Sequence, residues 1–207
     1  MVKCALKPKS QFAWNTFRKK WLSPPHIHKT VSQHHFQCWL IELKQQRYSS
    51  LPHRFRKHRE WNRLQQQLWN YWSQCLCQKS SVYVAQATHT KMGLGLFARK
   101  TLVVRRDLPL AIGHRRRISS VVYHKLLNQQ HTCFVYDHES THVYWVDGPI
   151  VLANHACAPN VSLEFETNVV VLRLTKAVIT RDQELFVDYG PQFWQDRDES
   201  CCCVDCK

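Results

Sequence analysis

Residues 154–160 read Asn154-His155-Ala156-Cys157-Ala158-Pro159-Asn160, a dense polar cluster between two apolar stretches. The side chains of Asn154 and His155 can each donate and accept hydrogen bonds. Taken alone, the cluster is better explained by a buried polar turn that satisfies its own backbone. Its meaning therefore depends on what the rest of the chain places beside it.

Two further motifs frame this cluster. Residues 92–98 read Met-Gly-Leu-Gly-Leu-Phe-Ala, and two glycines ahead of a predicted strand let a ligand approach the backbone closely. Residues 184–190 read Glu-Leu-Phe-Val-Asp-Tyr-Gly, where Tyr189 ends a predicted strand and could point its hydroxyl into a cleft. Each has a plain alternative, since Gly-x-Gly turns are common and a lone tyrosine at this position is more often part of the core.

The C-terminus carries cysteines at metal-binding spacing. Residues 201–206 read Cys-Cys-Cys-Val-Asp-Cys, so Cys201, Cys203 and Cys206 form a Cys-x-Cys-x-x-Cys motif with Cys202 in surplus. Three thiolates from one short loop make a tetrahedral zinc site that lacks one ligand. The chain has 10 cysteines and no recognisable secretory signal, which favours reduced thiols over disulfides. A palmitoylated or oxidised tail is the alternative.

Together, in this order, the three motifs resemble the signature of SET-domain protein lysine methyltransferases over about residues 85–207. The resemblance implies S-adenosylmethionine as cofactor and a mainly β fold of the SET type, the β-clip with its pseudoknot. It implies that Cys157 completes a structural zinc site with Cys201, Cys203 and Cys206 in a post-SET tail. It also implies Tyr189 as the catalytic tyrosine.

The same resemblance implies roles for further residues. The cofactor would be held by Met92, Gly93, Leu94, Gly95, Asn154, His155 and Trp194. Tyr136, Tyr144 and Trp145 are candidates for the wall of the lysine channel. On this basis we expect the three motifs to line one common pocket.

Some features narrow the resemblance and others depart from it. Gly148-Pro149, Phe193-Trp194 and the compact cysteine tail are most similar to the family that methylates lysine twenty of histone H4. Where family members commonly have a glycine before the third motif, this chain has Arg181-Asp182-Gln183. Arginines at 105–106 and 115–117 look like basic insertions.

The pattern of apolar residues changes near residue 80. Before it, Phe36, Trp39, Leu40 and Leu43, and then Trp61, Leu64, Leu68, Trp72 and Cys75, recur at helical spacing and predict two amphipathic helices, at 31–46 and 54–77, whose aromatic stripe is core. After it, short apolar runs predict strands at 82–85, 94–98, 134–136, 143–146, 161–165, 169–174 and 185–189, and Ile118, Val121, Val122 and Leu126 predict one helix. We expect a basic helical segment at 1–80, a SET domain at 81–193 and a zinc-binding tail at 194–207.

The charge is concentrated in the first segment. Residues 1–80 hold 15 Lys and Arg against 2 Asp and Glu, whereas residues 81–207 hold 14 against 13, which accounts for the net charge of +14. A basic segment favours an acidic partner such as nucleosomal DNA, unless it is simply a solvated surface. No apolar stretch is long enough for a membrane span.

These observations lead to one function and one alternative. The chain is expected to methylate a histone or another basic-tailed protein in the nucleus, although an acid-poor N-terminus leaves organelle targeting open. The alternative is a SET scaffold that has lost catalysis and binds nucleic acid or chromatin. The presence of Tyr189 favours the enzyme.

Overall fold

The computed structural model describes most of the chain. Its described residues are 16–17, 19–21, 30–48, 55–88, 93–103, 109–128, 134–137, 142–196, 200–201 and 203–206, and at 46–48, 55–60, 128, 134 and 204 only the backbone is described. They divide into two compact units, one ending at Ser80 and one beginning at Ser81. Each unit is described by itself.

The first unit is helical. It contains α2 (Gln33–Tyr48) and α3 (Phe55–Tyr71), and α3 continues into a π-helical turn, η1 (Trp72–Leu76). All nine apolar residues of the two predicted stripes are buried, so the stripes are core. The Phe36 ring links the two helices, because it stacks on Trp39 at 5.7 Å and on Trp72 at 5.7 Å between ring centroids.

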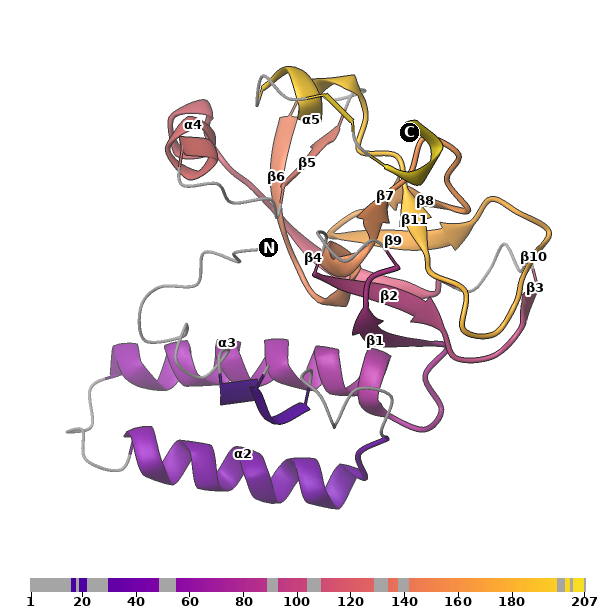
Figure 1. The fold of residues 1–207 in the computed structure, drawn as a ribbon. Helices are drawn as coiled ribbons and strands as arrows, with labels where there is room; N and C mark the ends of the chain where they lie inside the picture. The colour runs from indigo at the N-terminus through magenta and orange to yellow at the C-terminus, as the bar shows by residue number, and fades with distance from the viewer. Residues whose placement is uncertain are drawn as a thin grey trace. The chain divides into compact units, whose positions relative to one another are not determined.

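The second unit is built mainly of short strands, as the sequence predicted (Figure 1). The strands are β1 (Val82–Gln86), β2 (Leu94–Ala98), β3 (Leu102–Val103), β4 (Ala111–Arg117), β5 (Phe134–Asp137), β6 (His142–Asp147), β7 (Asn154–His155), β8 (Val161–Phe165), β9 (Val169–Leu174), β10 (Val178–Ile179) and β11 (Phe186–Val187). The helical elements are α4 (Ser120–Asn128), η3 (Pro149–Leu152), α5 (Pro191–Gln195) and η4 (Val204–Cys206). None of the helices in the described ranges has the length and hydrophobicity needed to cross a bilayer.

The largest sheet has the strand order β5-β6-β4-β9-β8, so its central strand is the arginine-rich β4. The sequence did not predict this strand, because residues 115–117 looked like a basic insertion rather than an apolar run. The structure explains how the arginines fit. Arg115 lies over the rings of Tyr144, at 4.4 Å, and Phe165, at 5.1 Å, while Arg116 and Arg117 are exposed. A stacked guanidinium lets a charged strand occupy the middle of a sheet.

Three two-stranded pairs complete the unit. β1 and β2 form an antiparallel hairpin, β3 pairs antiparallel with β10, and β7 pairs parallel with β11. The last pair matters most for function, because it sets Asn154 beside Phe186 and His155 beside Val187. The second and third sequence motifs are thereby brought into register.

The helix α4 lies where the spacing of apolar residues predicted one, but its predicted stripe is not a buried face. The side chains of Val121 and Val122 are 77% and 42% exposed. Instead, the Tyr123 hydroxyl donates a hydrogen bond to the Asp196 carboxylate. One polar contact therefore joins α4 to the C-terminal end of α5.

A left-handed residue marks the turn before the third motif. Asp182 has φ of 64°, a conformation that favours glycine and tolerates aspartate. Its Oδ1 accepts a hydrogen bond of 2.9 Å from the Tyr83 hydroxyl. Burial first and then this bond raise the pKa of Tyr83 to about 12. Aspartate, where family members commonly have a glycine, therefore adopts the same left-handed turn and also accepts a hydrogen bond from Tyr83 on β1.

We expect Asp182→Ala to lower the free energy of unfolding by about 2–4 kcal/mol, because it combines the left-handed penalty of an ordinary residue with the loss of a hydrogen bond to a carboxylate. Asp182→Gly loses only the bond and should be milder by about 1–2 kcal/mol. Urea denaturation of both variants measures the difference. Equal destabilisation would show that the backbone conformation contributes nothing.

Candidate functional site

A buried carboxylate holds the three motifs together. Glu184 is 3% exposed, and its Oε1 accepts a hydrogen bond of 2.8 Å from Asn154 Nδ2. Its Oε2 accepts a hydrogen bond of 2.7 Å from the backbone N–H of Thr88, which lies two residues after β1 and before the glycine motif. Asn154 Nδ2 also donates to the Leu94 carbonyl at 3.2 Å. One carboxylate thus bonds to groups from two other parts of the chain, and we call these contacts the Glu184 clasp.

The two glycines of the first motif have different surroundings. A β-carbon on Gly95 would lie 2.3 Å from Glu184 Oε1 and 3.1 Å from Asn154 Nδ2, so the missing side chain makes room for the clasp. Gly93 has φ of 80°, and a β-carbon there would meet nothing within 4 Å. Of these two positions Gly93 is the one that borders open space, and the expectation that both glycines admit a ligand stays a prediction.

The second and third motifs meet at His155 and Tyr189. His155 is 3% exposed, and its Nδ1 accepts a hydrogen bond of 3.1 Å from the backbone N–H of Tyr189. The Tyr189 hydroxyl donates to the Ala153 carbonyl at 2.9 Å. Both ends of the tyrosine are therefore bound to one three-residue stretch, 153–155.

The surroundings of the His155 ring shift its pKa in opposite directions. Burial lowers the pKa of His155, whereas the Asp188 carboxylate, the Val187 carbonyl and the Asp205 carboxylate act in the other direction. Asp188 Oδ1 lies 3.7 Å from His155 Nδ1. With a lowered pKa and Nδ1 accepting a hydrogen bond, the neutral ring carries its proton on Nε2.

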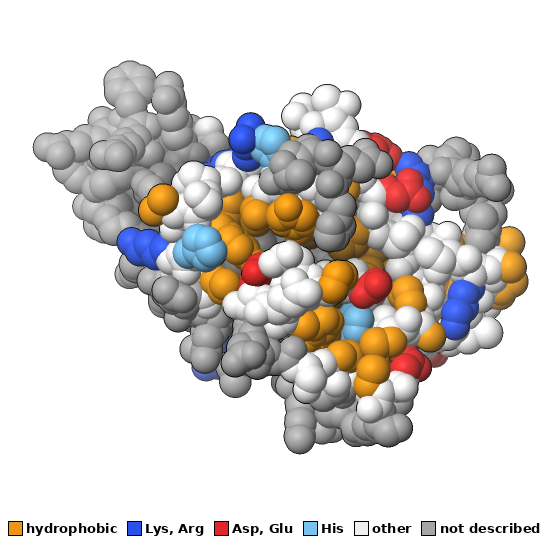
Figure 2. Space-filling view, turned by 90° about the horizontal axis from the view of Figure 1, so that it is seen from above, with side chains coloured by type: hydrophobic (Ala, Val, Ile, Leu, Met, Phe, Trp, Pro, Cys, Tyr) orange, Lys and Arg blue, Asp and Glu red, His pale blue; other side chains and the backbone are white. Residues whose placement is uncertain are grey.

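A cavity of about 380 Å³ opens beside Tyr189. Its walls are mostly apolar and come from β5, β6, β8, η3 and the Tyr189 segment, and they include Tyr136, Phe165 and Phe193. The charged side chains in its lining are Asp188 and Asp196, and neither lysine nor arginine is among the described residues that line it. Figure 2 shows hydrophobic side chains gathered near the middle of one face, with acidic and histidine side chains among them.

The structure separates the predicted site residues into two groups. Tyr189 and Tyr136 line the cavity, but Gly93, Leu94, Gly95, Asn154, His155 and Trp194 do not. Stretch 153–155 connects the two groups by hydrogen bonds, and the expectation that they line one common pocket stays a prediction. Met92 lies outside the described residues.

Two candidates for the channel wall lie elsewhere. Trp145 is 4% exposed, and its Nε1 donates to Asp147 Oδ1 at 2.8 Å. Tyr144 stacks with Arg115 and reaches the cavity only indirectly, through its ring contact with Phe165 at 5.9 Å. The sequence pattern of β6 does not tell which of its side chains face the cavity. In the structure Val143 and Val146 of this strand line it.

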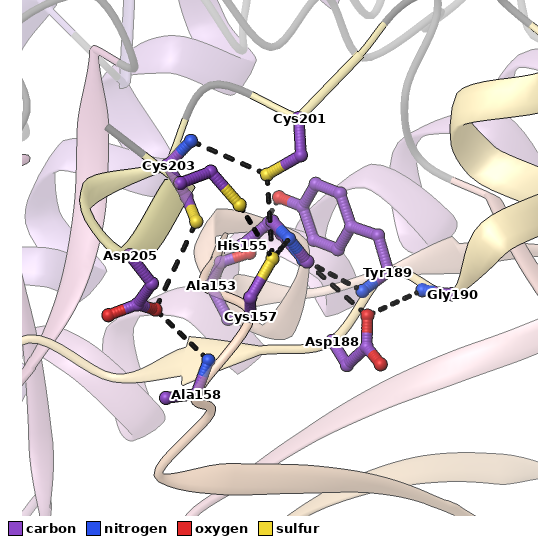
Figure 3. Close-up of polar contacts among 11 residues, drawn as sticks. Ala153, His155, Cys157, Ala158, Asp188, Tyr189, Gly190, Cys201, Cys203 and Asp205 are labelled. Carbon is purple, nitrogen blue, oxygen red and sulfur yellow. Dashed lines mark hydrogen bonds and ion pairs between the residues drawn. The ribbon is translucent and has the colours of Figure 1, made fainter.

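Thiols from two distant segments converge beside His155 (Figure 3). Cys157 Sγ lies 3.8 Å from Cys201 Sγ, 3.2 Å from Cys206 Sγ and 3.5 Å from His155 Nε2. The ligand atoms of His155, Cys157, Cys201 and Cys203 all lie within 4.8 Å of one another. Ligand atoms at about 2.0–2.3 Å from one zinc ion would stand roughly 3.3–3.8 Å apart, so this group of three sulfurs and one ring nitrogen is of the right size to hold a metal.

The thiols of the cluster shift one another's pKa values. Hydrogen bonds from the neighbouring thiols, that of Cys206 first, raise the pKa of Cys157. Burial acts against ionisation of Cys203, but backbone N–H groups of Cys157 and Asp205 outweigh it and lower the pKa of Cys203 to about 7. Several thiolates this close together are stable only with a positive charge among them.

Comparison with known families agrees with this geometry. The sequence profile of the SET domain matches residues 25–190, which is most of the chain. The chain belongs to the SET-domain family. Proteins of this family are generally lysine methyltransferases, so the fold and the family-level activity inferred from the three motifs are supported.

Other comparisons add nothing to this assignment. No curated protein sequence matches significantly. A solved structure from Plasmodium falciparum, provisionally described as a histone methyltransferase, is 19% identical with a TM-score of 0.43, covering 55% of this chain and 96% of that one. A likeness at this level carries no argument about substrate.

The residues that support the site do not stand out in the sequence. Glu184 is distinguished only as the first residue of the third motif, and the sequence pattern indicates no role for Thr88 or Asp188. The signal for Glu184 was present, because an acidic residue directly before an apolar strand is a candidate for a buried acceptor. Nothing local to Thr88 could have revealed a partner 96 residues away.

We expect Gly95→Ala to destabilise the protein by about 1–3 kcal/mol, because its β-carbon overlaps the Glu184 carboxylate. The shorter side chain of Glu184→Asp should relieve that overlap, so the double variant should be less destabilised than the sum of the single ones. Gly93→Ala is the control, since nothing lies near its β-carbon, and it should combine additively with Glu184→Asp. Additive behaviour at Gly95 would argue against the clasp.

Proposed function

We propose that this SET protein is an S-adenosylmethionine-dependent lysine methyltransferase that modifies a histone or another basic-tailed protein. The observation that supports this best is the cavity beside Tyr189, which is apolar except for tyrosine hydroxyls, a few neutral polar groups and two acidic side chains. A lysine side chain has a matching character, because it joins a four-carbon apolar stem to a single cation. Methylation of lysine twenty of histone H4 is a finer proposal of the same kind.

The cavity suits a lysine in both of its protonation states. Asp188 and Asp196 would attract the ammonium as it approaches. The nucleophile, however, must be the neutral amine, and a lysine with a pKa of about 10.4 is only about one part in a thousand neutral near pH 7.4. Apolar walls such as Val146 and Ile150 disfavour the charged form and so lower the free-energy cost of losing the proton.

Tyr189 is placed to orient that amine. Its hydroxyl proton is directed at the Ala153 carbonyl, and a hydroxyl oxygen has two acceptor lone pairs besides its one donor. The oxygen can therefore accept a hydrogen bond from the amine while the ring stays fixed. The amine would first lose one proton to solvent, and Tyr189 would then hold its lone pair toward the methyl donor.

The cofactor would bind on the other side of stretch 153–155. Contacts run continuously there from Leu94 to Asn154 and then to His155, whose ring lies 5.0 Å from that of Trp194. Gly93 adds open space beside the backbone. S-adenosylmethionine supplies an activated methyl group when it is bound at such a site. The half-buried Trp194 ring offers a surface on which an adenine base can stack.

The cysteine cluster would hold one structural zinc ion through Cys157, Cys201, Cys203 and Cys206. His155 and Cys206 compete for the fourth position. A zinc ligand must offer a lone pair, and the Nε2 that faces Cys157 carries the ring proton when Nδ1 accepts from Tyr189. His155 therefore supports Cys157 as an N–H donor, and Cys206, 3.2 Å from Cys157, completes the set.

Other parts of the assignment stay predictions. These are nuclear location, with organelle targeting as the alternative, and DNA binding by the basic segment. The presence of Tyr189 in the lining of the cavity favours the enzyme over an inactive scaffold.

We expect Tyr189→Phe to lower kcat on core histones by about 10- to 1,000-fold, because it removes one oriented hydrogen-bonding group. Tyr83→Phe is the matched control, since it also deletes a hydroxyl bonded to oxygen but one that is bound to Asp182. It should leave kcat within about twofold. Mass spectrometry of methylated histones measures both. Cofactor binding by calorimetry with no turnover on any histone would support the scaffold instead.

We expect Cys206→Ser and Cys203→Ser each to lose bound zinc and, with it, activity through loss of the ordered tail, because three thiolates hold the ion far more weakly than four. Cys38→Ser is the control, since that thiol lies on α2 and should leave the zinc content unchanged. Metal content after gel filtration measures the effect. A Cys206→Ser protein that keeps one zinc per chain would assign the fourth position to His155.

A further inference from the structure

The side chain of His155 touches both the metal cluster and the segment that carries the catalytic tyrosine. We propose that His155 is a positioning residue whose ring contacts both the Cys157 sulfur and the Tyr189 backbone, so that metal binding fixes the position of Tyr189 beside the cavity. The inference rests on the proposed function. It assigns no new ligand to the metal, but it gives the metal a consequence at the site of methyl transfer.

The first step in the argument is the position of Tyr189 in the chain. The parallel ladder of β7 and β11 ends at Val187, so Tyr189 lies beyond regular pairing. Gly190, directly after it, has φ of 75°, and its N–H donates to Asp188 Oδ1 at 2.9 Å. The Tyr189 N–H itself donates to His155 Nδ1 at 3.1 Å. Side chains, not the sheet, therefore hold this turn.

The second step is the other nitrogen of the same ring. Nε2 lies 3.5 Å from Cys157 Sγ, the thiol that also contacts Cys201 and Cys206. An N–H donor to a metal-bound thiolate is a charge-assisted contact, and it strengthens when the sulfur carries its negative charge. Groups that support a ligand in this way typically change metal affinity or activity by about 10- to 100-fold when they are removed.

The third step is that the ring cannot easily turn away. It is buried against Tyr189, at 5.3 Å between centroids, and against Trp194, at 5.0 Å with an interplanar angle of 72°. Figure 3 shows the ring lying between the thiols on one side and the backbone of Tyr189 on the other. A rigid ring with a partner at each nitrogen transmits a displacement of Cys157 to Tyr189.

The hydrogen bond to Nδ1 decides the tautomer that the proposal needs. The Tyr189 N–H donates to Nδ1 at 3.1 Å, and a proton on Nδ1 would place two N–H donors against each other. The proposal therefore requires the Nε2–H form, which ring nitrogen-15 chemical shifts of the zinc-loaded chain report directly. The Nδ1–H form would overturn it.

Amide hydrogen exchange tests the coupling without any need for activity. In the full chain, adding Zn²⁺ to chelator-treated protein should slow exchange of the Tyr189 amide by about tenfold or more, as removal of a supporting group changes metal sites by about 10- to 100-fold. The Gly190 amide, which is bonded to Asp188, should respond less. Equal protection of the Tyr189 amide with and without Zn²⁺ would overturn the proposal, and it would do so whether or not any histone is methylated.

Variants separate positioning from simple packing. His155→Phe keeps a ring and loses both nitrogens, so zinc-dependent protection of Tyr189 should vanish and kcat should fall about 10- to 100-fold, with the KM for a histone peptide little changed. His155→Gln keeps one acceptor and one N–H donor and should restore part of both. His114→Phe, at an exposed position of β4, is the control. Unchanged protection and kcat in a zinc-loaded His155→Phe protein would contradict the proposal.

Two outcomes need separate interpretation. If His155→Phe does not fold, the ring tautomer and the zinc dependence of Tyr189 exchange in the unaltered chain still decide the question. If the unaltered chain shows both signatures but methylates no histone and binds no S-adenosylmethionine, the proposed function fails while the structural link from metal to Tyr189 stands.

Discussion

The hydrogen bond between the Glu184 carboxylate and the Asn154 amide is the contact on which the site depends. A carboxylate that is 3% exposed must be fully hydrogen-bonded, because an unsatisfied buried acceptor costs about 1–3 kcal/mol and a charged one more. Its partners come from Thr88, which lies between β1 and β2, and from the Asn-His motif, and the missing side chain of Gly95 leaves room for them to meet. Satisfying one buried group thus brings together three segments that the chain separates.

The fold could be predicted because each of the predicted strands has its own apolar run and the three motifs occur in the order typical of the family. Seven apolar runs predicted strands that the structure has, and the three motifs identified the SET family correctly. The central strand β4 could not be predicted, because a hydrophobic pattern cannot identify a strand whose half-buried arginine stacks on Tyr144 and Phe165. The neighbours of Tyr144 and Trp145 could not be predicted for a related reason. Without β4 as the known neighbour of β6, the sequence alone does not tell which face of β6 each side chain takes.

The site has two sides, and this division follows from the parallel pairing of β7 with β11. Successive residues of a strand point to opposite faces, so the side chains of Asn154 and His155 meet different neighbours. Asn154 turns to the clasp, while His155 lies under the thiols and meets Tyr189. A pocket for one molecule would have sufficed for binding. Two spaces separated by a single stretch of backbone suit a reaction in which two molecules must meet at one point.

The distances along the chain between these partners also constrain how the protein comes to be folded. Tyr83 is bonded to a residue 99 positions later, Thr88 to one 96 later, and Leu94 to one 60 later. Contacts between such remote segments form slowly, because the chain loses loop entropy before it gains the bond. During synthesis the β1–β2 hairpin has therefore emerged long before Glu184, with a buried position and no acceptor to fill it. Until the segment that carries Glu184 has been synthesised, the hairpin must therefore avoid pairing with other segments of the nascent chain.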